Sequence, residues 1–233
     1  MNDLFSILWI IITLLIVIFI TYITRKRGYV TLTALYCTMA VSSAIAATKI
    51  VSIFGLFVPG GVIIYAASFL ITDLISEVYG KESAQKTVLH GFGAMVIFAL
   101  YSLLIVDWEA APYWTNQEAF ESVVGLSFRI TMAGWISFLI SQRWDVWIFH
   151  LLKESSKQWI NKRLWVRNIF STVTSQILDT VIFITISFYG IYDNLLDMIL
   201  AQYAIKLIIA IVDTPFAYWG RKILKSEIKQ ENY

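Results

Sequence analysis

The chain has 233 residues, of which 58% are hydrophobic and only 15% are charged, and its mean hydropathy is +0.71. This composition excludes an ordinary soluble domain and indicates a polytopic membrane protein. The apolar runs are too long for outer-membrane barrel strands, and the single cysteine, Cys37, excludes intrachain disulfides and cysteine metal clusters. The net charge of +2 says little until the basic residues are placed along the chain.

Apolar stretches long enough to cross a bilayer, which takes about 20 residues, recur along the chain. They predict an all-α protein with seven transmembrane helices, over residues 4–24, 30–51, 61–79, 88–106, 126–152, 166–190 and 197–219. Between the second and third, the apolar but helix-breaking segment 55–61 predicts either a tight hairpin or a partly re-entrant loop. The first span lacks a basic leader, so we expect a retained helix rather than a signal peptide.

Basic residues follow the first, third and fifth spans and fill the tail, whereas the opposite loops carry acidic residues and no Lys or Arg. The positive-inside rule therefore predicts an N-terminus outside and a C-terminus in the cytoplasm, in a multi-pass protein of the inner membrane. The basic residues of the predicted inner side are Arg25, Lys26, Arg27, Lys81, Lys86, Lys153, Lys157, Lys162, Arg163, Arg167, Arg221, Lys222, Lys225 and Lys229.

Ionisable and amide side chains inside the predicted spans are expensive in hydrocarbon unless they face a cavity or a partner. They follow helical spacing in the third, fifth, sixth and seventh spans, so these helices are predicted to enclose a polar cavity. As its substrate-binding residues we predict Asp73, Glu77, Gln142, Asp145, Asn168, Gln176, Asp179 and Lys206. Candidates for stacking on a flat ligand are Tyr65, Phe69, Trp144 and Phe183.

Structural roles stay open for several of these groups. The alternatives are a solvated Glu77 beside Lys81, a buried ion pair between Lys206 and Asp179, and a pairing of Arg143 with Asp145 or Asp73. Lys49 and Arg129 fall near the outer boundary, where we expect them to be interfacial.

Signatures of a membrane-embedded enzyme are weak. The chain has no HExxH motif and only two histidines, His90 and His150, so we predict no catalytic residues, metal or cofactor. Residues 125–128 superficially match the nucleophile motif of a serine intramembrane protease, but Ser127 maps to the outer end of its span and both histidines map to the cytoplasmic side. The mixed signs of the polar stripes also disfavour an ion channel. We therefore expect a carrier.

Four segments carry a family resemblance. They are residues 69–80, the Ser-x-x-x-Ser-Gln-x-x-Asp-Val pattern of 137–146, residues 167–190, and residues 203–218 with Tyr203-x-x-Lys206 and Thr214-Pro215-x-x-Tyr218. In this order they resemble the queuosine precursor transporter family, also described as a vitamin uptake transporter family, over residues 30–222. Typical members have Asn where this chain has Thr72 and Ser76.

The resemblance implies import of 7-cyano- or 7-aminomethyl-7-deazaguanine for making queuosine. It also implies a six-helix core, residues 30–222, similar to the substrate-binding subunits of energy-coupling vitamin importers. Residues 1–29 would add an N-terminal helix with a basic inner loop, and residues 223–233 a cytoplasmic tail. The expected partners are the 7-deazapurine and the lipid bilayer, not nucleic acid, and small residues in the first two spans permit a homodimer. The alternatives are a binding subunit of a multi-subunit ATP-driven importer and a membrane-embedded enzyme.

Overall fold

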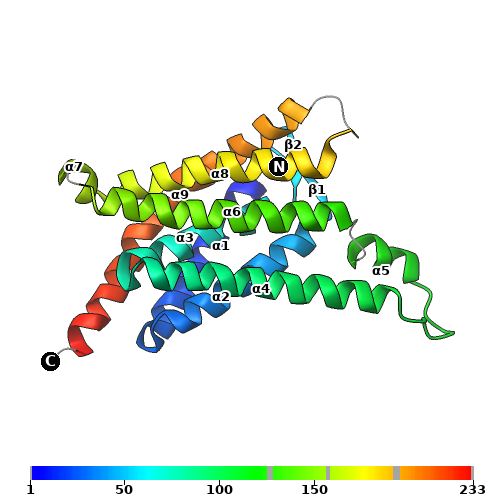
Figure 1. The fold of residues 1–233 in the computed structure, drawn as a ribbon, viewed down its shortest axis with the longest axis horizontal. Coiled ribbons are helices and arrows are strands. Elements are labelled where there is room, and N and C mark those ends of the chain that lie inside the picture. The colour runs from blue at the N-terminus through cyan, green and yellow to red at the C-terminus, as the bar shows by residue number, and fades with distance from the viewer. Residues whose placement is uncertain (1, 125–127, 156–157, 191–194, 232–233) are drawn as a thin grey trace.

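The computed structural model describes residues 2–124, 128–155, 158–190 and 195–231, which form an elongated helical bundle (Figure 1). Each predicted span corresponds to one long helix. These are α1 (Asn2–Thr24), α2 (Tyr29–Ala46), α3 (Val62–Tyr79), α4 (Lys81–Val106), α6 (Phe128–Lys153), α8 (Leu164–Phe188) and α9 (Leu195–Glu231). Shorter elements are η1 (Arg25–Arg27), α5 (Gln117–Val124), α7 (Gln158–Asn161) and the strands β1 (Ile50–Ile53) and β2 (Leu56–Pro59).

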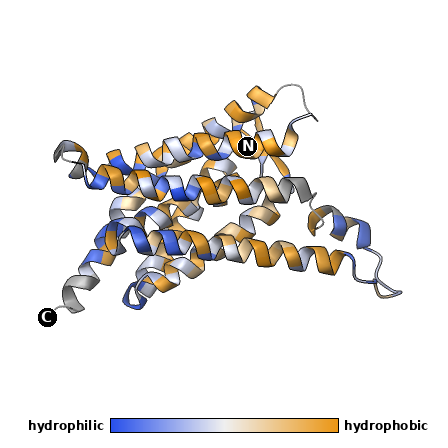
Figure 2. Cartoon of the chain, viewed as in Figure 1, coloured by the Kyte–Doolittle hydropathy of each residue, from blue (hydrophilic) through white to orange (hydrophobic). Residues whose placement is uncertain are grey.

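Within the described residues, six helices are long and apolar enough to cross a membrane, namely α1 with η1, α2, α3, α4, α8 and α9. The remaining long helix, α6, has 26 residues but carries Gln142, Arg143 and Asp145 in one short stretch. Hydrophobic residues dominate the middle of the bundle, and hydrophilic residues gather towards its two ends (Figure 2). This is the pattern of a multi-pass membrane protein.

A β-hairpin interrupts the predicted helical pattern, so the expectation of purely α structure was wrong at this point. Helix α2 ends at Ala46, not at residue 51, and β1 pairs with β2 antiparallel, with Ile53 opposite Leu56. The two turn residues, Phe54 and Gly55, have φ values of 52° and 77°, as a tight hairpin turn requires. The hairpin alternative for this segment is therefore confirmed.

Helix α3 lies at the centre of the bundle and is buried over most of its length. It packs against α1, α2, α4, α6 and α9, while α6 and α8 form the most extensive helix pair. On α1, Ile10, Leu14 and Val17 are buried, whereas its remaining apolar side chains are mostly exposed. Such an exposed apolar face is suited to lipid.

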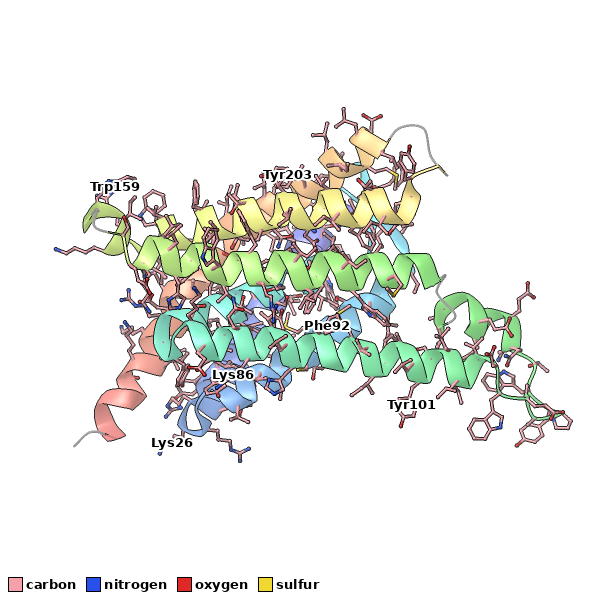
Figure 3. All side chains as sticks on the ribbon, viewed as in Figure 1. Lys26, Lys86, Phe92, Tyr101, Trp159 and Tyr203 are labelled. Atoms are coloured by element: carbon pink, nitrogen blue, oxygen red, sulfur yellow. The ribbon has the colours of Figure 1, made fainter. Side chains whose placement is uncertain are left out.

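The two ends of the bundle carry different elements. Helix α7 and the C-terminal end of α9 lie at one end, towards which the labelled Lys26 and Lys86 side chains also lie, and α5 and the hairpin lie towards the other (Figures 1 and 3). Two helices are longer than the spans predicted for them: α4 begins at Lys81 and not at residue 88, and α9 extends to Glu231 and not to residue 219. Basic residues that we had assigned to loops or to the tail therefore sit on helices.

Gly61 provides a test of the junction between the hairpin and α3. A Cβ atom added to Gly61 would lie 2.1 Å from the backbone oxygen of Ser43, so Gly61→Ala has to displace α2 or the hairpin. We expect a clear drop in the thermal unfolding temperature of the purified protein in detergent. Gly93→Ala is the matched control, because an added Cβ there meets no atom within 4 Å. Equal unfolding temperatures for the two variants would contradict this packing.

Candidate functional site

A cavity of about 320 Å³ lies between the hairpin end of the bundle and its middle. It is lined by residues of α2, α3, α4, α6, α8 and α9, with further contributions from both strands and α5. Most of the wall is apolar and includes Met95, Phe98, Trp135 and Phe183. Its polar lining is formed chiefly by Ser43, Thr48, Tyr65, Ser102, Ser137, Asp179, Gln202 and Lys206. This volume lies at the lower end of the roughly 300–1,000 Å³ that is usual for small-molecule sites.

Asp179 on α8 is the centre of the polar part of the cavity. Its Oδ2 atom forms an ion pair with Lys206 of α9, and its Oδ1 atom accepts hydrogen bonds from the Tyr65 hydroxyl (2.7 Å) and from Ser141 Oγ (3.2 Å). The Lys206 ammonium also lies 5.2 Å from the centre of the Tyr65 ring, within the range of a cation–π contact. Four helices, α3, α6, α8 and α9, thus meet at one carboxylate.

Gln202 adds an open acceptor to this site. It lies one helical turn before Lys206 on α9, lines the cavity and is 6% exposed. In the described part of the chain, Gln202 Oε1 accepts no hydrogen bond. Because an unpaired buried carbonyl costs free energy, a ligand N–H that reached it would be stabilised.

Deeper polar side chains continue the site along the contact between α6 and α8. Ser141 of α6 donates to Asp179 of α8, and one turn further in, Ser175 of α8 donates to Asp145 of α6 (2.9 Å). These reciprocal hydrogen bonds connect the cavity floor to a buried polar layer. Its other members are Asp73, Gln142, Asn168, Gln176 and Asp213, none of which lines the cavity.

Beyond this layer, basic residues of three helices surround the buried carboxylate of Glu77. Its oxygens lie 2.6 Å from Arg167 Nη2, 3.7 Å from Lys153 Nζ, 3.0 Å from Arg221 Nε and 3.3 Å from Lys225 Nζ. Lys153 Nζ also donates to the backbone oxygens of Ser76 and Glu77. We call these five charged residues the Glu77 cluster. The alternative of a solvated Glu77 beside Lys81 was therefore wrong.

The structure separates the eight predicted site residues into three levels. Asp179 and Lys206 line the cavity and form the ion pair that we considered as an alternative. Glu77 lies in the cluster just described, and the other five, Asp73, Gln142, Asp145, Asn168 and Gln176, form the buried layer between. Their part in binding stays a prediction.

Of the stacking candidates, Tyr65 and Phe183 line the cavity, whereas Phe69 is buried away from it and Trp144 is 40% exposed. Pairing of Arg143 with Asp145 or Asp73 was wrong, because Arg143 is exposed and has no ion pair among the described residues. Lys49 is exposed. Ser127 and the side chain of Arg129 lie outside what the structure describes.

Our predicted binding set omitted Trp135, Ser137 and Gln202. Gln202 had a usable signal, since it lies four residues before Lys206 and so on the same helical face. The sequence held no signal that would single out Trp135, because aromatic residues are frequent along the whole chain.

A bundle of membrane-spanning helices around a small cavity with an ionic floor defines a membrane protein that takes up a small solute within the bilayer. Residues 59–220 match the family model described as "Putative vitamin uptake transporter". The chain therefore belongs to this family, whose members are transporters and not enzymes. The resemblance noted from the sequence is thus confirmed.

Curated relatives carry the corresponding names. The probable queuosine precursor transporter of Bacillus subtilis (strain 168) is 30% identical over 181 residues, covering 77% of this chain and 78% of that protein. The queuosine precursor transporter of Escherichia coli (strain K12) is 26% identical over 167 residues, covering 70% and 72%. No solved structure matches the chain. These relatives and the apolar helices make the chain a multi-pass membrane protein, consistent with the inner membrane.

Removing the charge of Glu77 tests the cluster around it. Glu77→Gln leaves buried Arg167 and its basic neighbours without their counter-charge, and breaking a buried ion pair typically costs about 3–5 kcal/mol. We expect a large fall in the thermal unfolding temperature in detergent. Glu82→Gln is the matched control, because its pair with Lys86 (2.8 Å) is exposed and adds little to stability. An unchanged unfolding temperature for Glu77→Gln would contradict the assigned role.

Proposed function

We propose that this chain is a carrier that imports a 7-deazaguanine precursor of queuosine, 7-cyano- or 7-aminomethyl-7-deazaguanine, and binds it in the cavity above Asp179 and Lys206. The names of the curated relatives support the substrate class. The observation that carries the proposal is the meeting of a buried carboxylate, a buried ammonium and an open amide oxygen at the floor of an aromatic-walled cavity.

These groups match the hydrogen-bonding edge of a guanine-like ring. Its N1–H and 2-amino donors suit the Asp179 carboxylate and Gln202 Oε1, and its O6 acceptor suits the Lys206 ammonium. The ion pair holds both charges in place before the ligand arrives, which lowers the cost of ordering them on binding. Trp135 and Phe183 offer apolar surface to the flat faces of the ring. A base with the wrong donor pattern would leave a buried group unpaired, at a cost of about 1–3 kcal/mol.

Asp179→Asn is the direct test of this site. It keeps the shape of the side chain but removes the negative charge that faces Lys206, so the affinity for 7-cyano-7-deazaguanine should fall at least tenfold, corresponding to about 1.4 kcal/mol. Binding is measured by isothermal titration on purified protein, and transport by counterflow in proteoliposomes. Asp197→Asn, an exposed substitution on α9, is the control and should behave as the wild type. Unchanged affinity in Asp179→Asn would refute the assignment of the site.

The proposed topology has seven spans, with α6 crossing the membrane between α4 and α8, the N-terminus outside and the C-terminus in the cytoplasm. The fit of α6 against α8 and α4 and its 26-residue length support a seventh span. In this orientation the cavity lies towards the outside and the Glu77 cluster closes the cytoplasmic end. Residues 30–222 would form the transporting core, with α1 packed against α3 and α9 as an added helix. Alternating access then requires the Glu77 cluster to open.

Cysteine labelling distinguishes seven spans from six. In a Cys37→Ser background, Trp114→Cys lies before α6 and Trp159→Cys after it, both at exposed positions. A membrane-impermeant maleimide applied to spheroplasts should label the first variant and should label the second only after permeabilisation. Lys26→Cys serves as the inner-side control. Labelling of both Trp positions from the same side would exclude a spanning α6.

A further inference from the structure

Three buried carboxyl groups lie below the cavity and take no part in its lining. They are Asp73 of α3, Asp145 of α6 and Asp213 of α9, which are 2%, 0% and 0% exposed. They stand in the polar layer between the Asp179–Lys206 pair and the Glu77 cluster. The binding role proposed above does not use them.

Hydrogen bonding in this layer is incomplete. Asp145 Oδ1 accepts from Ser175, and Asp213 Oδ1 accepts from the Asn168 amide (2.9 Å). Among the described residues, Oδ2 of both side chains and both oxygens of Asp73 accept no hydrogen bond. The carboxyl groups of Asp73 and Asp145 are, however, within hydrogen-bonding reach of each other when one of them carries a proton.

The charges that face Asp73 and Asp145 do not neutralise them. Arg167 of α8 is the cation that acts on Asp73, but its guanidinium is bound to Glu77. The other facing groups are Asp213 of α9, a third carboxyl, and the uncharged Tyr36 hydroxyl of α2. Two facing carboxylates in a medium of low polarity repel each other strongly, and a single proton between them removes one charge and supplies the missing donor.

A divalent cation does not fit the layer as well as a proton does. Among the described residues, no group of three or more Asp, Glu, His or Cys side chains is arranged to hold a metal ion. The amide of Gln142 is fully buried three residues before Asp145 on the same helical face, and neither of its polar atoms has a partner in the described structure. A neutral polar group with open donor and acceptor positions beside the pair is suited to passing a proton on, directly or through water.

We propose that Asp73 and Asp145 together bind one exchangeable proton, and that this proton is carried inward with the substrate. The proposal rests on the proposed transport function. The reciprocal Ser141–Asp179 and Ser175–Asp145 hydrogen bonds link the proton site to the floor of the cavity. A carboxylate of the pair takes up a proton from the outside while the Glu77 cluster is closed, and the resulting carboxyl group releases it to the cytoplasm when the cluster opens. No covalent bond other than O–H forms or breaks.

Infrared spectroscopy tests the proton site without any substrate. The wild-type protein in lipid at neutral pH should show the C=O stretching band of a protonated carboxyl group, and Asp73→Asn/Asp145→Asn should lose it. Asp213→Asn, which removes the neighbouring carboxyl, is the matched control and should keep it. Size-exclusion profiles establish that each variant is folded. A band that persists in the double variant, or that is absent from the wild type, would overturn the proton site.

Uptake into proteoliposomes tests the coupling to transport. With the exterior acidified, labelled 7-cyano-7-deazaguanine should accumulate above its equilibrium level in the wild type and in the exposed control variant Asp197→Asn. In Asp73→Asn and Asp145→Asn the ratio of uptake with and without the pH gradient should show no stimulation. A stimulated ratio in both variants, or accumulation that follows a sodium gradient instead, would overturn proton coupling. If the wild type neither binds 7-cyano-7-deazaguanine nor exchanges it in counterflow, the proposed substrate is wrong. The proton site is then still tested by the infrared band, which needs no substrate.

Discussion

A charged side chain in the interior of a bilayer has to meet a partner or a polar cavity, and this constraint determines how the helices of this protein are arranged. Helices α3, α6, α8 and α9 each carry ionisable groups in their apolar stretches, so their polar faces have to turn towards one another. Asp179 shows the result most directly, because its two oxygens are shared among side chains from α3, α6 and α9. Helix α1 carries no such groups along its apolar length and packs at the edge with an exposed apolar face.

The same four helices are joined at three successive levels. Asp179 and Lys206 join them at the cavity floor, the Asp73–Asp145 pair lies in the middle, and Glu77 collects cations from α6, α8 and α9 at the inner end. Arg167 belongs to two levels, because it binds Glu77 and also acts on Asp73. A movement that opens the inner end by displacing α8 therefore changes the surroundings of the carboxyl pair as well.

The sequence was sufficient to predict the long helices and to offer the ion pair between Asp179 and Lys206 as an alternative, because apolar length and helical spacing are local properties of the chain. The sequence alone does not decide between a hairpin and a re-entrant loop, since Ile50–Ile53 is as apolar as the helix that precedes it and a short apolar run does not distinguish strand from helix. The sequence could not predict the ion-pair partners of Glu77, for a different reason. Lys153, Arg167 and Arg221 are far apart in sequence, and only the packing of three helices brings them to one carboxylate. The pairing of Arg143 with Asp145 was wrong because residues two positions apart lie about 200° apart around a helix, so Arg143 faces outwards while Asp145 faces the interior.

The Glu77 cluster and the carboxyl layer above it carry opposite excess charges, and this affects what happens when the inner end of the carrier opens. The Glu77 cluster holds more cations than carboxylates, whereas the layer above it holds three carboxyl groups and no cation of its own among the described residues. In the closed arrangement the excess positive charge lies next to the excess of acidic groups and offsets part of it. Opening the cluster to water would screen those cations, which by itself favours the protonated carboxyl, but it would also hydrate the carboxyl groups, which favours loss of the proton. Hydration is the larger effect, because all three carboxyl groups are almost completely buried in the closed arrangement. A dry environment thus favours both the closed inner end and a bound proton in the layer above. Opening of the Glu77 cluster ends the closed state and releases the proton in one conformational change.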